Sequence, residues 1–380
     1  MSGIAWLDTS PADERRMREI VRLFSDTATL DDLGIGQVRD GLSDLMFPGT
    51  STVHARPRYF LIIPWIFQRA SAKASGTSIL TKANNEERKL IEVMRTPPAV
   101  DGMIGKIAGK TVRALPSRLY WAALQRYGIL GDSKAYGWNM PIAPPPGFPG
   151  QLDGGLDLTA EEAEFLRERI MLTCKGSYLA YLLADGLNAD SAEAYFPWAH
   201  PALAAAPPRL REIVEHARLF SLAINGATLL YNLLVAEKFD EVSAEDGGHA
   251  ESYREALDEW VEEVELNRDA ITRWDLDAFW TVVHEGRSGR PVGLASKIFV
   301  DQWLARLRST DAHELATSAA IRDMIAERER KNKGEHSRLN NERQIRNWGG
   351  ASGAGRLTYR WFIVQRMLTD IQEGLAGARS

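Results

Sequence analysis

The sequence predicts a mainly α, multi-helical protein with two to three packed domains and at most a small β element near residues 58–67. Three observations lead to this fold class. Apolar residues recur at spacings of three and four along most of the chain, which is the period of one helix face. Thr159 stands three residues before Glu162, the signature of a capping box at a helix start. Alternating β-branched runs bounded by turn pairs are nearly absent, so no extended sheet is expected.

The N-terminal region is expected to begin with a helix near residues 10–24, where Ser10 and Glu14 precede an apolar stripe. Residues 58–67 form an apolar run interrupted by Pro64. Periodicity alone leaves this run open between a strand and a buried helix. Later helices are expected at 86–95, 117–127, 159–172, 176–187, 208–238, 250–270, 296–308 and 357–375.

The helix expected around residues 208–238 contains an uncharged stretch, 219–236, that resembles a membrane span in length. It is at the short end for a bilayer helix. It also places polar side chains on one helical face, at Ser221, Asn225, Thr228 and Asn232. We therefore expect a buried core helix and no membrane.

The clearest boundary is the proline-rich stretch 140–150, which lacks the amide hydrogens that a helix or sheet interior needs. It is interpreted as a stiff linker or an ordered surface loop. It divides an N-terminal, mostly helical domain (1–139) from a helical middle domain (151–310). A basic C-terminal helical segment (311–380), with a glycine-rich loop at 349–355, follows.

Composition excludes several classes of protein. The net charge of -5 over 380 residues is too small to predict a partner for the whole chain. The single cysteine, Cys174, excludes an intramolecular disulfide and a cysteine-only zinc site. The first ten residues lack the basic and apolar regions of a signal peptide. We therefore expect a cytoplasmic protein.

Charge is polarised along the chain. Residues 237–265 contain twelve acidic and two basic residues, whereas residues 328–346 contain seven basic and three acidic ones. Residues 101–126 contain five basic residues and one acidic residue. These runs are either solvated helix faces or, for the two basic segments, one surface for a phosphate backbone.

No complete catalytic motif is present. Residues 105–111 resemble a phosphate-binding loop, but only three residues separate Gly105 from Gly109, where the motif needs four. Glu329 and Lys331, with Asp311 or Asp323 upstream, resemble a nuclease metal site, although a solvated helix explains them better. The seven histidines show no metal-ligand spacing. We therefore expect no catalytic residue, metal or cofactor.

The glycine-rich loop 349–355 is more informative because it is followed by arginines and aromatics. Arg356 and Arg360 are four residues apart, so they would share a face of a helix starting near Leu357. Such a helix start can hold an anion, and Tyr359 or Trp361 can stack on a base. The alternative is a flexible loop with Trp361 in the core.

Several sequence blocks together resemble an uncharacterised bacterial family, and they extend over nearly the whole chain. The blocks are Phe47–Thr52, Arg58–Phe60, Pro64–Trp65, Arg218, Phe220–Ser221, Gly226–Ala227, Leu230–Asn232, Arg328–Glu329, Arg338–Leu339, Trp348–Gly349, Leu357–Trp361 and Asp370–Ile371. Proteins of this kind look like companions of helicases and phospholipase D-like nucleases in mobile antiviral-defence gene clusters. The resemblance implies a role directed at DNA or RNA, and no established activity.

The leading hypothesis is a non-catalytic subunit of a bacterial antiviral-defence or DNA-processing assembly. It would bind nucleic acid, with DNA favoured over RNA, or partner proteins such as a helicase or a phospholipase D-like nuclease, or both. The alternatives are a protein scaffold docking through its acidic helix and a cryptic metal-dependent nuclease. The expected nucleic-acid-binding residues are Arg56, Arg58, Lys106, Lys110, Arg328, Lys331, Lys333, Arg338, Arg346, Arg356 and Arg360.

Overall fold

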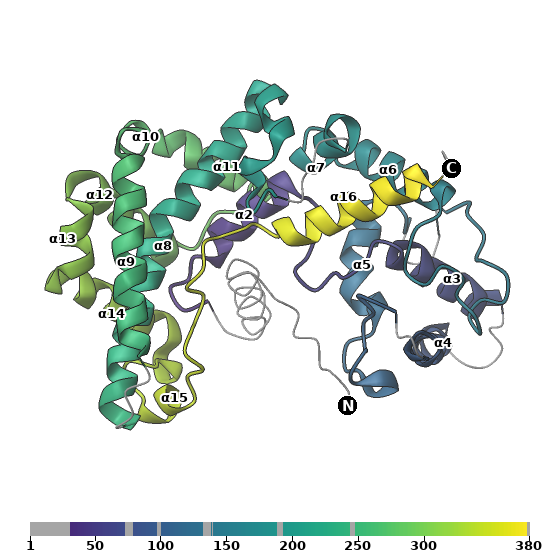
Figure 1. Ribbon diagram of the computed structural model, residues 1–380, viewed down its shortest axis with the longest axis horizontal. Helices are drawn as coiled ribbons and strands as arrows, with labels where there is room; N and C mark the ends of the chain where they lie inside the picture. Colours follow the sequence, from purple (N-terminus) through teal and green to yellow (C-terminus); the bar gives the residue numbers. More distant parts are fainter. Residues whose placement is uncertain are drawn as a thin grey trace, which may run out of the picture. The chain divides into compact units, whose positions relative to one another are not determined.

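The computed structural model describes residues 31–72, 79–96, 100–131, 138, 140–187, 193–243 and 248–377. The helix expected at residues 10–24 lies outside these residues. Within them the chain forms fifteen α-helices and several short 3₁₀ or π turns (Figure 1). No strand is present among the described residues, where Leu130 and Trp138 make an isolated antiparallel bridge. The prediction of a mainly α, multi-helical fold is confirmed.

The apolar run at 58–67 is helical. It belongs to α3 (Tyr59–Ala72), which contains Pro64 in its interior. Tyr59, Phe60 and Trp65 are almost fully buried, as are most of their neighbours along this helix. Because the helix is apolar on all sides, its sequence shows no periodic stripe, and periodicity could not separate it from a strand.

The chain divides into two compact units that alternate along the sequence. Unit 1 takes the described residues within Met1–Leu42 and Glu215–Leu357, and unit 2 takes those within Ser43–Val214 and Thr358–Ser380. The sequence interpretation instead used three consecutive segments. The proline-rich stretch 140–150, interpreted there as a boundary, lies inside unit 2.

Unit 2 contains two groups of helices. In the first, α3 contacts α4 (Ile79–Arg95) and α5 (Pro116–Arg126), and the 3₁₀ turn η2 (Gly109–Thr111) contacts α4. In the second, the C-terminal helix α16 (Trp361–Ala376) lies along α6 (Ala160–Thr173), as Figure 1 shows. The remaining elements are α7 (Tyr178–Tyr181), the π turn η4 (Leu182–Gly186), η5 (Pro197–Ala199) and η6 (Pro201–Ala205).

Two local features fix the pair α6 and α16. The capping box at the start of α6 is confirmed: Thr159 accepts from the Glu162 amide, and the Glu162 side chain accepts from the Thr159 amide. Gly374 lies at a tight contact between α16 and α6, because a Cβ there would come within 2.8 Å of the Cβ of Ala163. A larger residue at this position would force the two helices apart.

The proline-rich stretch packs onto α3. The Trp65 indole donates to the carbonyl of Ile142 at 2.8 Å, and its ring meets that of Phe148 edge to face at 5.6 Å. Met140, Ile142 and Phe148 are buried. The stretch is therefore an ordered segment of unit 2.

Unit 1 is built around α8 (Pro208–Ser243), whose residues from Glu215 onward belong to it. Two tryptophans bind the backbone of α8: Trp260 donates to Leu222 at 2.9 Å and Trp303 to Ala223 at 2.7 Å. The other elements are α2 (Gly36–Met46, which continues into unit 2), α9 (His249–Leu266), α10 (Arg268–Arg273), α11 (Leu276–Gly286), α12 (Leu294–Ser309), α13 (Ala312–Thr317), α14 (Ala319–Lys333), η7 (Gly334–His336) and α15 (Glu342–Arg346).

By length and composition α8 could cross a membrane, since it has an 18-residue window of mean hydropathy 1.6. That window is 94% buried inside the protein. Burial of this kind is what the core helix of a packed domain requires, and it explains the apolar composition without a bilayer.

Candidate functional site

The polar face predicted on α8 binds the backbone of the glycine-rich loop. Asn232 pairs with Ser352 through two hydrogen bonds of 2.8 Å, one to its carbonyl and one from its amide. Asn225 donates to the carbonyl of Ala354 at 2.9 Å, and Ser221 donates to that of Leu357 at 3.0 Å. The polar face of α8 and the glycine-rich loop are both visible in the sequence. The hydrogen bonds between them are not, because the two segments are far apart along the chain.

The segment after this loop differs from the sequence prediction. Helix α16 begins at Trp361, so Arg356 and Arg360 precede it and do not share a helix face. Arg356 makes two contacts with the carboxylate of Glu263 on α9, at 2.6 and 2.7 Å. Arg360 donates to Asp44 at 2.7 Å from a left-handed backbone with φ of 67°. Of the alternative, the placement of Trp361 in the core is confirmed, because its side chain is fully buried, whereas the loop before it is held by hydrogen bonds to α8.

Two more of the expected nucleic-acid-binding residues, Lys333 and Arg338, belong to a buried charge cluster in unit 1. Asp32 forms ion pairs with both of them, and its distance to Arg338 is 2.9 Å. Arg338 also donates to the hydroxyls of Ser352, at 2.7 Å, and Tyr231, at 3.1 Å. Both cations are thus neutralised inside the fold.

Arg328 is also an internal residue. Its guanidinium donates to the carbonyls of Leu33 (2.7 Å) and Ala295 (3.2 Å) and to the hydroxyl of Ser296 (3.0 Å). It lies over the ring of Phe299 at 5.3 Å. Arg328 of α14 therefore connects the segment at Leu33 to the start of α12. Its guanidinium nitrogens donate to these internal acceptors and are not available to a phosphate.

The arrangement that the nuclease alternative requires is not assembled. Glu329 is fully buried and accepts from the Ser337 hydroxyl and the Arg338 amide, and burial raises the pKa of its carboxyl. Lys331 instead projects to solvent and pairs with Glu327 at 3.0 Å. Asp311 caps α13. No group of three histidine, cysteine or acidic side chains suited to a metal occurs in the described part of the chain.

In unit 2, Arg56 and Arg58 are buried and paired with carboxylates. Arg56 contacts Asp370 of α16 and Asp157, each at 2.6 Å. Arg58 contacts Glu162 at 2.9 Å and donates to the carbonyls of Asp153 and Gly155. Burial raises the pKa of Asp370 to about 6, although the guanidinium of Arg56 opposes the change. These arginines connect the helices of unit 2 through internal ion pairs.

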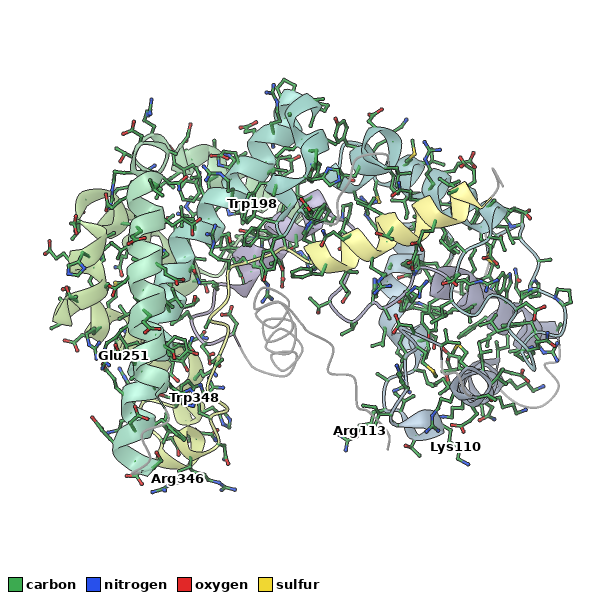
Figure 2. All side chains as sticks on the ribbon, in the orientation of Figure 1. Lys110, Arg113, Trp198, Glu251, Arg346 and Trp348 are labelled. Atoms are coloured by element: carbon green, nitrogen blue, oxygen red, sulfur yellow. The ribbon has the colours of Figure 1, made fainter. Side chains whose placement is uncertain are left out.

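The basic residues before and at the start of α5 differ from all of these. Lys106, Lys110, Arg113 and Arg118, which we call the basic segment, are exposed. None of them forms an ion pair with a carboxylate of the described residues. Figure 2 shows Lys110 and Arg113 extending outward from η2 and the residues just after it. The basic segment therefore presents positive charge at the surface without an ion pair of its own, although Lys110 lies within electrostatic reach of Glu92 and Arg118 within that of Glu87.

Two predicted residues in unit 1 are exposed but paired. Lys331 is matched by Glu327, and Arg346 lies 3.9 Å from Glu342, one helical turn away. Arg330 also pairs with Glu327, at 2.7 Å. Their charge is partly cancelled on the same helix surface.

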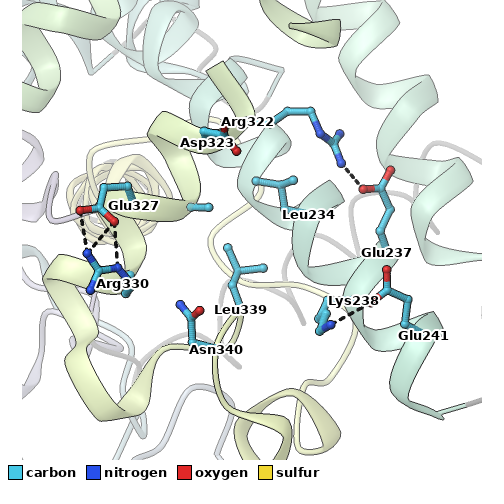
Figure 3. A pocket seen from close by; sticks show the side chains of 11 residues that line it. Leu234, Glu237, Lys238, Glu241, Arg322, Asp323, Glu327, Arg330, Leu339 and Asn340 are labelled. Atoms are coloured by element: carbon cyan, nitrogen blue, oxygen red, sulfur yellow. Dashed lines mark hydrogen bonds and ion pairs between the residues drawn. The ribbon is translucent and has the colours of Figure 1, made fainter. Parts of the chain in front are cut away.

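A polar pocket of about 570 Å³ lies between α8 and α14 in unit 1 (Figure 3). Its charged side chains pair with one another: Arg322 with Glu237, Lys238 with Glu241 at 2.8 Å, and Arg330 with Glu327. Asp323 lines it too, while Glu329 of the same helix is buried elsewhere. The three cations Arg322, Lys238 and Arg330 of the pocket lining are thus each paired with a carboxylate of the same lining.

These features define an all-α protein, in its described residues, whose internal arginines stabilise the fold and whose basic segment faces solvent. The chain belongs to DUF6361, a family of unknown function, which it matches over residues 1–375. The sequence resemblance to an uncharacterised family is confirmed in that respect. No curated protein and no solved structure matches the chain.

Proposed function

We propose that this protein is a non-catalytic, DNA-binding subunit of a bacterial antiviral-defence or DNA-processing assembly, acting in the cytoplasm beside partners such as a helicase or a phospholipase D-like nuclease. The observation behind the proposal is the basic segment. Its four cations are exposed and form no ion pair with a carboxylate of the described chain. Cations of this kind attract a phosphate backbone and displace its counterions.

The C-terminal arginines differ from the basic segment in pairing and exposure, and this difference indicates which cations would bind DNA. Arg338, Arg356 and Arg360 are each paired with an acidic side chain and less than one-fifth exposed. Releasing such a cation to bind phosphate would leave its carboxylate unpaired, which costs free energy. Binding is therefore assigned to Lys106, Lys110, Arg113 and Arg118.

The test is fluorescence anisotropy with a labelled duplex DNA at about 50 and about 200 mM salt. Wild type is expected to bind, with affinity falling steeply as salt rises. The triple variant Lys106→Ala, Lys110→Ala, Arg113→Ala removes three phosphate contacts. It should reduce the slope of log affinity against log salt by about 3.

A matched control removes three exposed cations that already pair with carboxylates: Arg330→Ala, Lys331→Ala and Arg346→Ala. It changes the net charge equally, so an effect of overall charge would appear in both variants. The control should bind DNA like wild type. Absence of binding by wild type at low salt, or equal losses in both triples, would refute the proposal.

A second candidate, the protein scaffold, is favoured by the outer face of α9. Glu251, Glu255, Asp258, Glu259 and Glu262 are all exposed there. A partner with a basic surface would be held by these side chains and released by salt. Reversal of Glu255, Asp258 and Glu259 to lysine should then abolish co-purification of products of neighbouring genes while leaving DNA binding intact.

A further inference from the structure

The basic segment begins with a tight turn that holds an isoleucine in solvent. Ile107 is 96% exposed and lies between Lys106 and Lys110. The turn is closed by a hydrogen bond of 2.7 Å from the Gly109 amide to the Gly105 carbonyl. Gly105 and Gly109 both have positive φ, 85° and 55°, which glycine adopts without steric cost.

The turn is also braced against α4. The Lys110 amide donates to Glu92 at 2.9 Å, and Arg88 donates to the carbonyls of Lys110 and Val112. A Cβ on Gly109 would collide with the side chains of Glu92 and Arg95. These contacts use the amides that a phosphate-binding loop would need, and they fix the orientation of Ile107.

Single exposed apolar side chains are common on protein surfaces and need no function. Ile107 differs because the backbone around it is held by hydrogen bonds and because the lysines on either side of it are exposed and form no ion pair in the described chain. A branched side chain in such a position can enter a gap between stacked bases while the cations contact the phosphates on either side.

We propose that Ile107 is a wedge that inserts between two base pairs of duplex DNA and partly unstacks them. This inference rests on the proposed function, since it names how the basic segment engages its ligand. The energetic cost of unstacking falls at a mismatch or a flexible step. The protein should therefore prefer duplexes that are already distorted.

The turn that carries Ile107 is better suited to duplex DNA than to a single strand. Proteins that hold single strands stack the bases on aromatic side chains, and the basic segment itself contains no aromatic residue. Duplex RNA is recognised mostly by its shape and through its 2′-hydroxyls and phosphates, whereas apolar wedges that unstack a base step are a feature of proteins that bind the minor groove of DNA.

The experiment uses the full chain and two readouts. Anisotropy measures binding, and the fluorescence of 2-aminopurine placed at a mismatch or TA step measures unstacking. Wild type should raise the 2-aminopurine signal and bind a mismatched duplex roughly tenfold more tightly than a matched one, because a mismatch lowers the cost of unstacking. Ile107→Ala should lose both effects while keeping the salt slope, because the lysines remain. Ile107→Phe should keep both.

The control is Leu172→Ala, which removes another exposed aliphatic side chain of unit 2, one that is 60% exposed. It should behave like wild type in both readouts. The wedge is refuted if wild type binds duplex DNA and Ile107→Ala gives the same 2-aminopurine signal; the proposed function would then stand. If wild type binds no DNA, both fail. Ile107-dependent sedimentation with phosphatidylserine vesicles, without base unstacking, would instead reassign the tip to a membrane surface.

Discussion

Asp32 and Arg338 form a buried ion pair in which Arg338 Nη1 lies 2.9 Å from the Asp32 carboxylate. Both side chains are nearly inaccessible, with exposed fractions of 10% and 13%. Since Lys333 pairs with the same carboxylate, one acid neutralises two cations that the sequence assigned to a DNA-binding surface. This pairing gives Arg338 a structural role and leads to the first prediction.

Arg338→Ala should destabilise the protein by about 2–3 kcal/mol, because Asp32 keeps Lys333 but loses one of its two cations and the hydroxyls of Tyr231 and Ser352 lose a donor. Urea unfolding measures the change. Arg346→Ala, at an exposed site, should stay within about 0.5 kcal/mol of wild type. A folded, fully stable Arg338→Ala with impaired DNA binding would restore the sequence interpretation.

The contact between Asn232 and Ser352 can be tested in the same way. Asn232→Ala leaves a buried amide and a buried carbonyl of Ser352 unpaired, which should cost about 3 kcal/mol. Hydrogen exchange should show the Ser352 amide losing protection. Thr228→Val, on the same face of α8 but without a bond to the loop, should leave that amide protected.

The ion pair between Arg56 and Asp370 holds α16 to the rest of unit 2. Arg56→Ala should destabilise by about 3–5 kcal/mol, because Asp370 is only 2% exposed and would be left without its cation. The double variant with Asp370→Asn should recover part of that loss, since no charge then remains buried. Additive losses in thermal or urea unfolding would mean that the two side chains do not stabilise each other.

The sequence predicted the helices well because their signals are local. The capping box at Thr159 and the apolar stripes of α6 and α12 depend on residues within a few positions of one another. Helix α3 stayed ambiguous because burial on all sides removes the stripe. Only tertiary packing decides between strand and helix for such a segment.

The candidate site was less predictable because the carboxylates that neutralise its arginines are distant in the sequence. The carboxylates that pair with Arg338, Arg360 and Arg356 stand 306, 316 and 93 residues away in the sequence. A run of arginines therefore looks the same in sequence whether it faces solvent or the core. Lys106 and Lys110 are predicted on the same grounds, and their exposure separates them from Arg338, Arg356 and Arg360.

Glu87 gives a pH-dependent prediction. It is 2% exposed on α4 and accepts from the amide and the hydroxyl of Ser117 at the start of α5. Burial raises the pKa of its carboxyl from 4.5 to about 7. The folded protein therefore keeps this proton between about pH 4.5 and 7, where the unfolded chain releases it. Stability contributed by the group is full below pH 4.5 and is lost as pH rises through 7.

Glu87→Gln mimics the protonated form and can keep both contacts with Ser117. It should match wild type near pH 5 and exceed it by up to about 3 kcal/mol at pH 8, the amount that corresponds to the pKa change. Urea unfolding at both pH values measures the difference. Glu255→Gln, at an exposed position on α9, controls for loss of a negative charge and should show no such pH-dependent gain. A gain for Glu87→Gln that is equal at pH 5 and pH 8 would show that the Glu87 proton is not what changes, because only titration of that carboxyl confines the difference to the higher pH.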